Sequence, residues 1–180
     1  MFLLTEILGS SHDTEMMMRM GASYAPLIIE EGEYYRLFTC MFLHFGIDHL
    51  FNNMLLLFFL GEILEGVIGK WRYLTIYMVG GIAANILSLW VELRMSMDMM
   101  PVSAGASGAI FAMIGAVVYL LIINEGRLEG LTIERLLIMI GLSLWQGFTS
   151  TNVDNVAHIG GLIAGFILAI IIYRKQRKIR

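Results

Sequence analysis

Three segments of the sequence contain polar residues that could take part in acyl transfer, and each lies near the beginning of a long apolar run. In chain order, these residues are His49, Asn53, Ser107 and His158. Serine is a weak nucleophile unless a neighbouring base accepts its proton, and histidine is the most common base in proteins. An asparagine amide and a histidine ring N–H can both donate hydrogen bonds to the oxyanion of a tetrahedral intermediate. These residue types therefore allow acyl transfer by a serine and a histidine.

Each segment taken alone also has an interpretation without chemistry. His49 and Asn53 are four residues apart, so they share one helix face and could simply be hydrated where a helix leaves the membrane. Small residues of the kind common at contacts between membrane helices surround the other two positions. They are Gly105 and Gly108 beside Ser107, and Gly161 and Gly165 after His158. The spacing within a single segment does not decide between packing and catalysis.

The composition indicates an integral membrane protein. Of the 180 residues, 58% are hydrophobic and 15% are charged, and the mean hydropathy is +0.75. Soluble domains are closer to about half apolar and about a quarter charged. The net charge of -3 excludes a broadly basic protein that binds nucleic acid. The single cysteine, Cys40, excludes an intramolecular disulfide and a cysteine-based zinc site. We expect neither a metal nor a cofactor.

Five apolar runs are long enough to cross a bilayer as helices, which takes about 20 residues each. They are residues 46–68, 72–92, 105–123, 132–149 and 154–173. None shows the strict alternation of a strand in a membrane β-barrel. The sequence therefore predicts an all-α fold, a polytopic membrane helix bundle, with residues 1–180 forming a single domain.

The basic residues predict the orientation of the bundle, because Lys and Arg are enriched in cytoplasmic loops. Most of the 12 Lys and Arg residues lie on one side, which includes the tail at residues 174–180. We therefore expect a cytoplasmic C-terminus and an outer loop at residues 9–45. Residues 1–8 are apolar but too short to span the membrane, so we expect them to be the outer part of a truncated first helix.

This orientation also brings the polar residues to a common depth. The first, third and fifth runs all descend from the outer side, and each carries its polar residue within its first few positions. His49, Ser107 and His158 should therefore lie at one level, slightly below the outer surface. Polar groups within a membrane are costly, so this coincidence favours a functional site over three unrelated residues. The small residues would let Ser107 Oγ approach His158 closely enough for a hydrogen bond.

Taken together, these residues resemble the rhomboid family of intramembrane serine proteases. The resemblance extends over most of the chain, from about Tyr35 to Tyr173, and its motifs are specific as an ordered set. The set comprises Arg36, the His-x4-His-x3-Asn spacing of His44, His49 and Asn53, then Glu65, Gly105-Ala106-Ser107-Gly108, and Ala157-His158 with Gly161 and Gly165.

The resemblance implies a six-helix core, of which the first helix is truncated here, and hydrolysis of peptide bonds in or near transmembrane segments. It implies Ser107 as the nucleophile and His158 as the general base. His49, Asn53 and the backbone N–H of Ser107 would form the oxyanion hole. The partners would be single-span transmembrane substrates and the lipid bilayer, without nucleic acid, and we expect the location to be a bacterial plasma membrane.

Two positions depart from the family pattern. Tyr35 precedes Arg36 where rhomboids commonly have tryptophan, which keeps an aromatic side chain for the membrane interface. Phe111 lies four residues after the serine, where tyrosine is common. It keeps a ring that can stack on the histidine but lacks the hydroxyl. Asp154 lies one turn before His158 and suggests a triad, but its place at the start of a helix favours N-capping.

The main alternative is a catalytically inactive rhomboid-like protein that binds transmembrane helices. Such proteins lose the serine or the histidine, and this sequence has both. A metalloprotease would need His-Glu-x-x-His, which the sequence lacks. An aspartyl protease would need two intramembrane aspartates, whereas Asp48 and Asp154 lie at helix ends. A channel would place polar residues along a whole path. We expect the helix at 132–149 and the loop at 147–153 to gate substrate entry.

Overall fold

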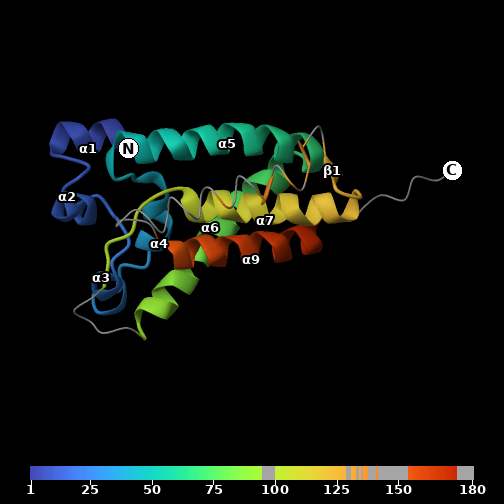
Figure 1. Ribbon diagram of the computed structural model, residues 1–180. Helices are drawn as coiled ribbons and strands as arrows, with labels where there is room; N and C mark the ends of the chain where they lie inside the picture. The colour runs from blue at the N-terminus through green and yellow to red at the C-terminus, as the bar shows by residue number, and fades with distance from the viewer. Residues whose placement is uncertain are drawn as a thin grey trace.

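The protein is a bundle of long helices (Figure 1). The computed structural model describes residues 1–94, 100–128 and 154–173, together with isolated positions between 131 and 141. The long helices are α5 (Gly46–Ile68), α6 (Lys70–Glu92), α7 (Ser107–Ile123) and α9 (Asn155–Ile172). A hairpin of two-residue strands, β1 (Arg127–Leu128) and β2 (Leu131–Thr132), follows α7. The predicted helix bundle is confirmed.

Three of these helices, α5, α6 and α9, are long and apolar enough to cross a membrane, and α7 is apolar but 17 residues long. Their bounds lie within about two residues of four predicted runs. Large apolar side chains such as Phe58, Ile86 and Ile163 remain exposed on α5, α6 and α9, as helices in contact with lipid require. The predicted run at 132–149 lies largely outside the described residues, and the loop at 147–153 lies wholly outside them.

A single glycine joins α5 to α6. Gly69 has a φ of 83°, in the left-handed region that glycine adopts without steric cost. The chain therefore turns within one residue, and α6 begins at Lys70, two residues before the predicted apolar run. Hydropathy alone missed this first part of the helix because Lys70 is charged.

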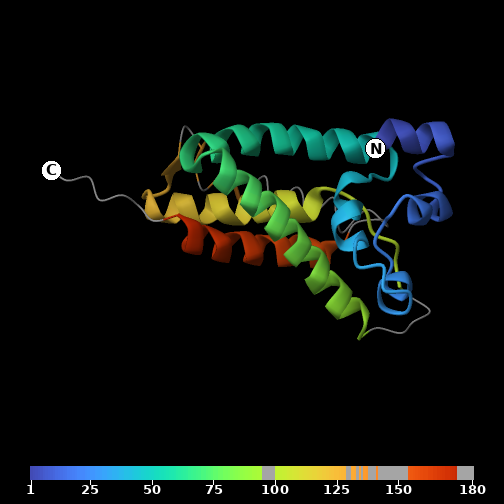
Figure 2. The same cartoon turned by 180° about the vertical axis from the view of Figure 1, so that it is seen from behind.

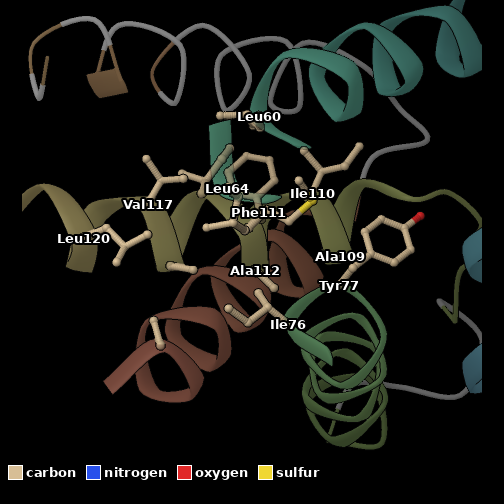
Figure 3. Close-up of a cluster of buried hydrophobic side chains, with 14 of the residues drawn as sticks. Leu60, Leu64, Ile76, Tyr77, Ala109, Ile110, Phe111, Ala112, Val117 and Leu120 are labelled. Atoms are coloured by element: carbon tan, nitrogen blue, oxygen red, sulfur yellow. The ribbon is translucent and has the colours of Figure 1, made fainter. Parts of the chain in front are cut away.

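Helix α7 lies at the centre of the bundle and packs most extensively against α9, then against α6 and α5. Twelve of its 17 residues are buried. Figure 3 shows Ile110 and Phe111 of α7 in a core with Leu64 of α5 and Ile76 of α6. Because α7 meets apolar neighbours on nearly every side, its sequence shows little of the 3.6-residue periodicity of an amphipathic helix.

Short helices cover one end of the bundle, where α5 begins (Figures 1 and 2). They are α1 (Phe2–Leu8), α2 (Thr14–Arg19), α3 (Ala25–Ile29), α4 (Arg36–Thr39) and the 3₁₀ helix η1 (Cys40–Phe42). Arg36 is 5% exposed and ties these elements together. Its Nη1 donates to the carbonyl oxygens of Met18 at 2.6 Å and Ala22 at 2.9 Å, and its guanidinium pairs with Glu33. Residues 1–8 were predicted to be helical, but the sequence predicted a loop over residues 9–45 and did not predict the helices within that range.

Candidate active site

The N-termini of α5, α7 and α9 lie at the same end of the bundle, next to the short helices (Figure 1). His49 and His158 are each the fourth residue of their helix, and Ser107 is the first residue of α7. The three residues that the sequence singled out therefore lie in the first turns of three helices, at one end of the bundle. The backbone N–H of Ser107 has no acceptor within its own helix, because the first N–H groups of a helix are never paired internally.

Two contacts hold the segment that leads into Ser107. Ser103 pairs with Ser23 in an isolated β-bridge, with N···O distances of 2.8 and 2.9 Å. The backbone N–H of Gly105 donates to the carbonyl oxygen of Cys40 at 2.9 Å. The serine is thus fixed by α7 after it and, before it, by contacts with Ser23, between α2 and α3, and with Cys40 of η1.

His49 and Ser107 line one small cavity, together with Asp154 and Ala157 at the start of α9. Its volume of about 20 Å³ is enough for one water molecule. Gly105, with a φ of 146°, also lines it. A Cβ at Gly105 would lie 2.9 Å from Cε1 of His49 and 3.7 Å from Ser107 Oγ. A glycine is therefore what lets this imidazole and this hydroxyl lie beside the same space.

The imidazole of His158 is buried and stacks on Phe111, with ring centroids 4.3 Å apart and planes 9° apart. Phe111 lies four residues after Ser107, so both share one face of α7, and the imidazole lies about one helical turn from the serine. Among the described residues, neither ring nitrogen of His158 has a hydrogen-bond partner, so the predicted bond with Ser107 Oγ is absent. Catalytic hydrogen bonds often form fully only when substrate binds.

Asn53 is buried on α5, and its Nδ2 donates to the backbone carbonyl of His49 at 2.9 Å. It is not among the described residues that line the cavity, and neither is His158. The structure therefore brings His49 to Ser107 but keeps the asparagine amide on its own helix. The amide has a second N–H that can still donate to a ligand.

The contact between α7 and α9 depends on glycines from both helices. A Cβ at Gly161 would overlap the carbonyl of Gly108, and a Cβ at Gly165 would overlap the carbonyl of Ala112. A Cβ at Gly115 would overlap a carbonyl of α9 in the same way. Gly161 and Gly165, which the sequence singled out, thus lie where the two backbones approach most closely.

Asp154 caps α9, as the sequence predicted, since its Oδ1 accepts from the backbone N–H of Ala157 at 2.8 Å. Its Oδ2 accepts from Ser88 Oγ on α6 and from Ser103 Oγ at 3.3 Å. Both oxygens are occupied without His158, so Asp154 does not orient the imidazole as the third member of a triad would. Sequence reasoning missed Ser88 because no motif or spacing connects the end of α6 to the start of α9.

The role of His44 also emerges only in the structure. Its ring is buried, lies edge-on to His49 at 5.3 Å, and accepts at Nε2 from the backbone N–H of Ala106, the residue before Ser107, at 3.4 Å. Burial lowers the pKa of His44 from 6.5 to about 4, with a smaller contribution from His49. The neutral ring is the form that can accept this hydrogen bond.

We expect the protein to lose stability in acid through His44. Because its pKa is lower in the folded state, the unfolded chain binds more protons between pH 6.5 and about 4. The contribution of His44 is therefore complete above pH 6.5 and falls as the pH drops through this window. His44→Gln keeps an acceptor but cannot titrate, so its thermal midpoint should depend less on pH. Thermal unfolding in detergent at a series of pH values measures the pH dependence of the midpoint in both proteins. Equal acid sensitivity of the wild type and His44→Gln would show that His44 does not cause the loss of stability.

A helix bundle with membrane-length helices, and a serine and two histidines at the same end, defines a polytopic membrane protein with residues suited to acyl transfer. Residues 31–175 match the model of the Rhomboid domain family. The chain is 40% identical over 169 residues to Rhomboid protease GluP of Bacillus subtilis (strain 168). It is 38% identical over 174 residues to RHOMBOID-like protein 7 and 36% identical over 168 residues to RHOMBOID-like protein 5, both of Arabidopsis thaliana.

The chain belongs to the rhomboid family, as its motifs implied, and it is an integral membrane protein. The three matches cover 94%, 95% and 92% of this chain. The chain spans 32% of the length of GluP and 52% of each plant relative.

Proposed function

We propose that the protein is an intramembrane serine protease that hydrolyses peptide bonds in or near transmembrane segments. The observation that carries the proposal is the stack of His158 on Phe111, one turn along α7 from Ser107. It joins an imidazole whose two nitrogens have no hydrogen-bond partner among the described residues to the helix face that begins with Ser107. Membership in a family that includes a relative named as a rhomboid protease supports the same class of reaction.

In the proposed mechanism, Ser107 Oγ attacks the scissile carbonyl carbon while His158 accepts the hydroxyl proton. The oxyanion is stabilised by the backbone N–H of Ser107, where the N-terminus of α7 adds a positive potential, and by His49 and Asn53. His158 then passes the proton to the leaving amine. A water molecule, deprotonated by the same imidazole, hydrolyses the acyl-enzyme.

We infer an orientation in which the site faces the outer side and the C-terminus is cytoplasmic. Lys70 and Arg72 follow the C-terminal end of α5, and Arg127 follows that of α7. These basic residues lie at the end opposite to Ser107, as cytoplasmic loops require. Single-span proteins of a bacterial plasma membrane would then present their outer portions to the site.

Labelling with a fluorophosphonate probe tests the proposal. The probe should react with the wild-type protein in detergent and should fail to react with Ser107→Ala. Ser10→Ala, which removes a hydroxyl from the N-terminal segment, is the matched control and should be labelled like the wild type. Cleavage of a panel of single-span proteins in liposomes then identifies the substrate class and the cut site. A wild-type protein that neither reacts nor cleaves would refute the protease function.

The alternative is a rhomboid-like protein that binds transmembrane helices without cutting them. Two observations favour it: no hydrogen bond joins Ser107 to His158 among the described residues, and the Asn53 amide is bonded to its own helix. The same probe separates the two functions. An unlabelled wild-type protein that still retains a transmembrane peptide in liposomes would support the binding function.

We expect Asn53→Ala to slow hydrolysis without abolishing it. Loss of one donor to an oxyanion typically lowers kcat about 10²- to 10³-fold, and here His49 and the Ser107 N–H would remain. Initial rates with a single-span substrate give kcat, and a thermal melt gives stability. A loss as complete as that of Ser107→Ala, with a lowered thermal midpoint, would assign Asn53 a structural role instead.

A further inference from the structure

A chain of three polar side chains connects the end of α6 to the first turn of α9. Ser88 Oγ lies within hydrogen-bond distance of Glu92 Oε1, at 3.2 Å, and of Asp154 Oδ2. Ser88 is 4% exposed and Glu92 is 7% exposed, so the contact is shielded from solvent. Asp154 continues the chain through its N-cap bond to Ala157. Four polar groups in contact thus lead from one helix to the other.

The protons in this chain are too few for two ionised carboxylates. A serine hydroxyl donates one hydrogen bond, whereas an ionised carboxylate only accepts. Ser88 contacts two carboxyl groups, so both contacts can be hydrogen bonds only if one carboxyl carries a proton. Both oxygens of Asp154 already accept from other donors, Ala157 N–H and Ser103 Oγ. Ionised Asp154 suits these donors, which leaves Glu92 as the protonated group.

The surroundings of Glu92 also favour a protonated carboxyl group. Among the described residues, no lysine or arginine pairs with its carboxyl, and Arg94 stacks on Trp90 instead. Moving an ionised carboxylate out of water without a cation beside it costs on the order of several kcal/mol or more. Burial therefore favours the neutral acid at Glu92. The hydrogen bonds then run in one direction, from Glu92 to Ser88 and from Ser88 to Asp154.

The last residue of this chain, Asp154, also contacts the backbone of His158. The backbone N–H of His158 donates to the carbonyl oxygen of Asp154 at 3.1 Å, one turn earlier in α9. The ring itself is held by stacking on Phe111, with no hydrogen bond among the described residues. The position of the ring relative to Ser107 therefore depends on where the first turn of α9 is held.

We propose that Glu92 shares its carboxyl proton through Ser88 with Asp154, and that this chain is the positioning device that holds the first turn of α9, and with it His158, beside Ser107. The effect on catalysis rests on the proposed protease function. The proton on Glu92 does not, and it can be measured in a protein that hydrolyses nothing.

Infrared difference spectroscopy of the full chain in liposomes tests the proton directly. A protonated carboxyl group has a carbonyl stretch that is distinct from the bands of an ionised carboxylate. At neutral pH, Glu92→Gln should lose the band of a protonated acid relative to the wild type. Glu15→Gln, at an exposed residue paired with Arg19 on α2, is the matched control and should leave that band unchanged. A Glu92→Gln spectrum that loses only carboxylate bands would overturn the proposal.

Kinetics with a single-span substrate test the positioning role. Asp154→Ala should lower kcat about 10²-fold with little change in KM, because a displacement of about 1 Å at a catalytic group can cost that much. Ser88→Ala should also lower kcat, and the double variant should be no slower than Asp154→Ala, since both changes break one chain. Asp13→Ala removes the N-cap of α2, with no link to α6, and should keep the wild-type kcat.

The conservative variant of Glu92 separates positioning from simple packing. The amide of Glu92→Gln can donate to Ser88 as the protonated acid does, so its kcat should stay close to the wild-type value, whereas Glu92→Leu should be slow. Additive losses in the double variant, or a Glu92→Gln protein as slow as Glu92→Leu, would contradict the chain. If Asp154→Ala does not fold, Ser88→Ala alone decides the positioning role. A wild-type kcat in Ser88→Ala would contradict the chain, and a reduced kcat would support it. A wild-type protein that cleaves nothing would refute the protease function. The infrared spectra would then still show whether Glu92 is protonated.

Discussion

Replacing Ser107 by alanine is expected to abolish hydrolysis, with kcat falling on the order of 10⁴-fold or more while the helix bundle remains intact. The hydroxyl lines the cavity at the start of α7, so its removal deletes the proposed nucleophile and leaves the helix contacts in place. His158→Ala should reduce kcat as severely, because the serine then has no base. The two residues act in one proton transfer, so the double variant should be no slower than either single variant.

Cleavage of a single-span protein in liposomes measures these losses, and thermal unfolding of each variant shows whether the fold is retained. Ser107→Ala should keep the wild-type thermal midpoint. His158→Ala should lower it, since the ring that stacks on Phe111 at 4.3 Å is removed from a buried position. Hydrolysis by Ser107→Ala at a rate comparable to the wild type would remove the serine from the mechanism. A double variant slower than both single variants would give the two residues separate roles.

The sequence predicted most of the helix bundle because hydropathy and length are local properties. The runs at 46–68 and 154–173 became α5 and α9 with nearly the same bounds. The short helices of residues 9–45 could not be predicted in the same way. They are held by contacts such as that of Arg36 with the carbonyl oxygens of Met18 and Ala22, which lie well apart from it in the sequence. Such long-range contacts leave no periodic pattern.

The candidate site was likewise only partly predictable from the sequence. The direction of each helix brought His49, Ser107 and His158 to one end, and direction follows from the number of crossings and the basic residues. Side-chain contacts between helices do not follow from either. The link from Ser88 to Asp154 and the missing bond between Ser107 and His158 depend on the rotation of α6, α7 and α9 about their axes, which packing decides.

The glycines show where a sequence pattern and packing meet. Gly165→Ala is expected to lower both the stability and the activity of the protein by separating α9 from α7. A Cβ at this position would overlap the carbonyl of Ala112, which is backbone and cannot swing aside as a side chain can. Helix α9 would have to shift, at a cost of about 1–3 kcal/mol of stability. His158 lies two turns earlier on the same face of α9, so the shift would move its ring and lower kcat about 10²-fold.

Gly61→Ala on α5 is the matched control, because it adds the same atom to another helix interior. There the new Cβ would lie 3.4 Å from the hydroxyl of Tyr73, an ordinary contact. Alanine is favoured over glycine inside a helix by about 0.5–1 kcal/mol, so Gly61→Ala should be at least as stable as the wild type and fully active. If Gly165→Ala is destabilised and Gly61→Ala is not, the loss comes from the close approach of the two backbones and not from a change in helix propensity. A Gly165→Ala protein with the wild-type thermal midpoint and kcat would mean that α7 and α9 are not held together at this glycine.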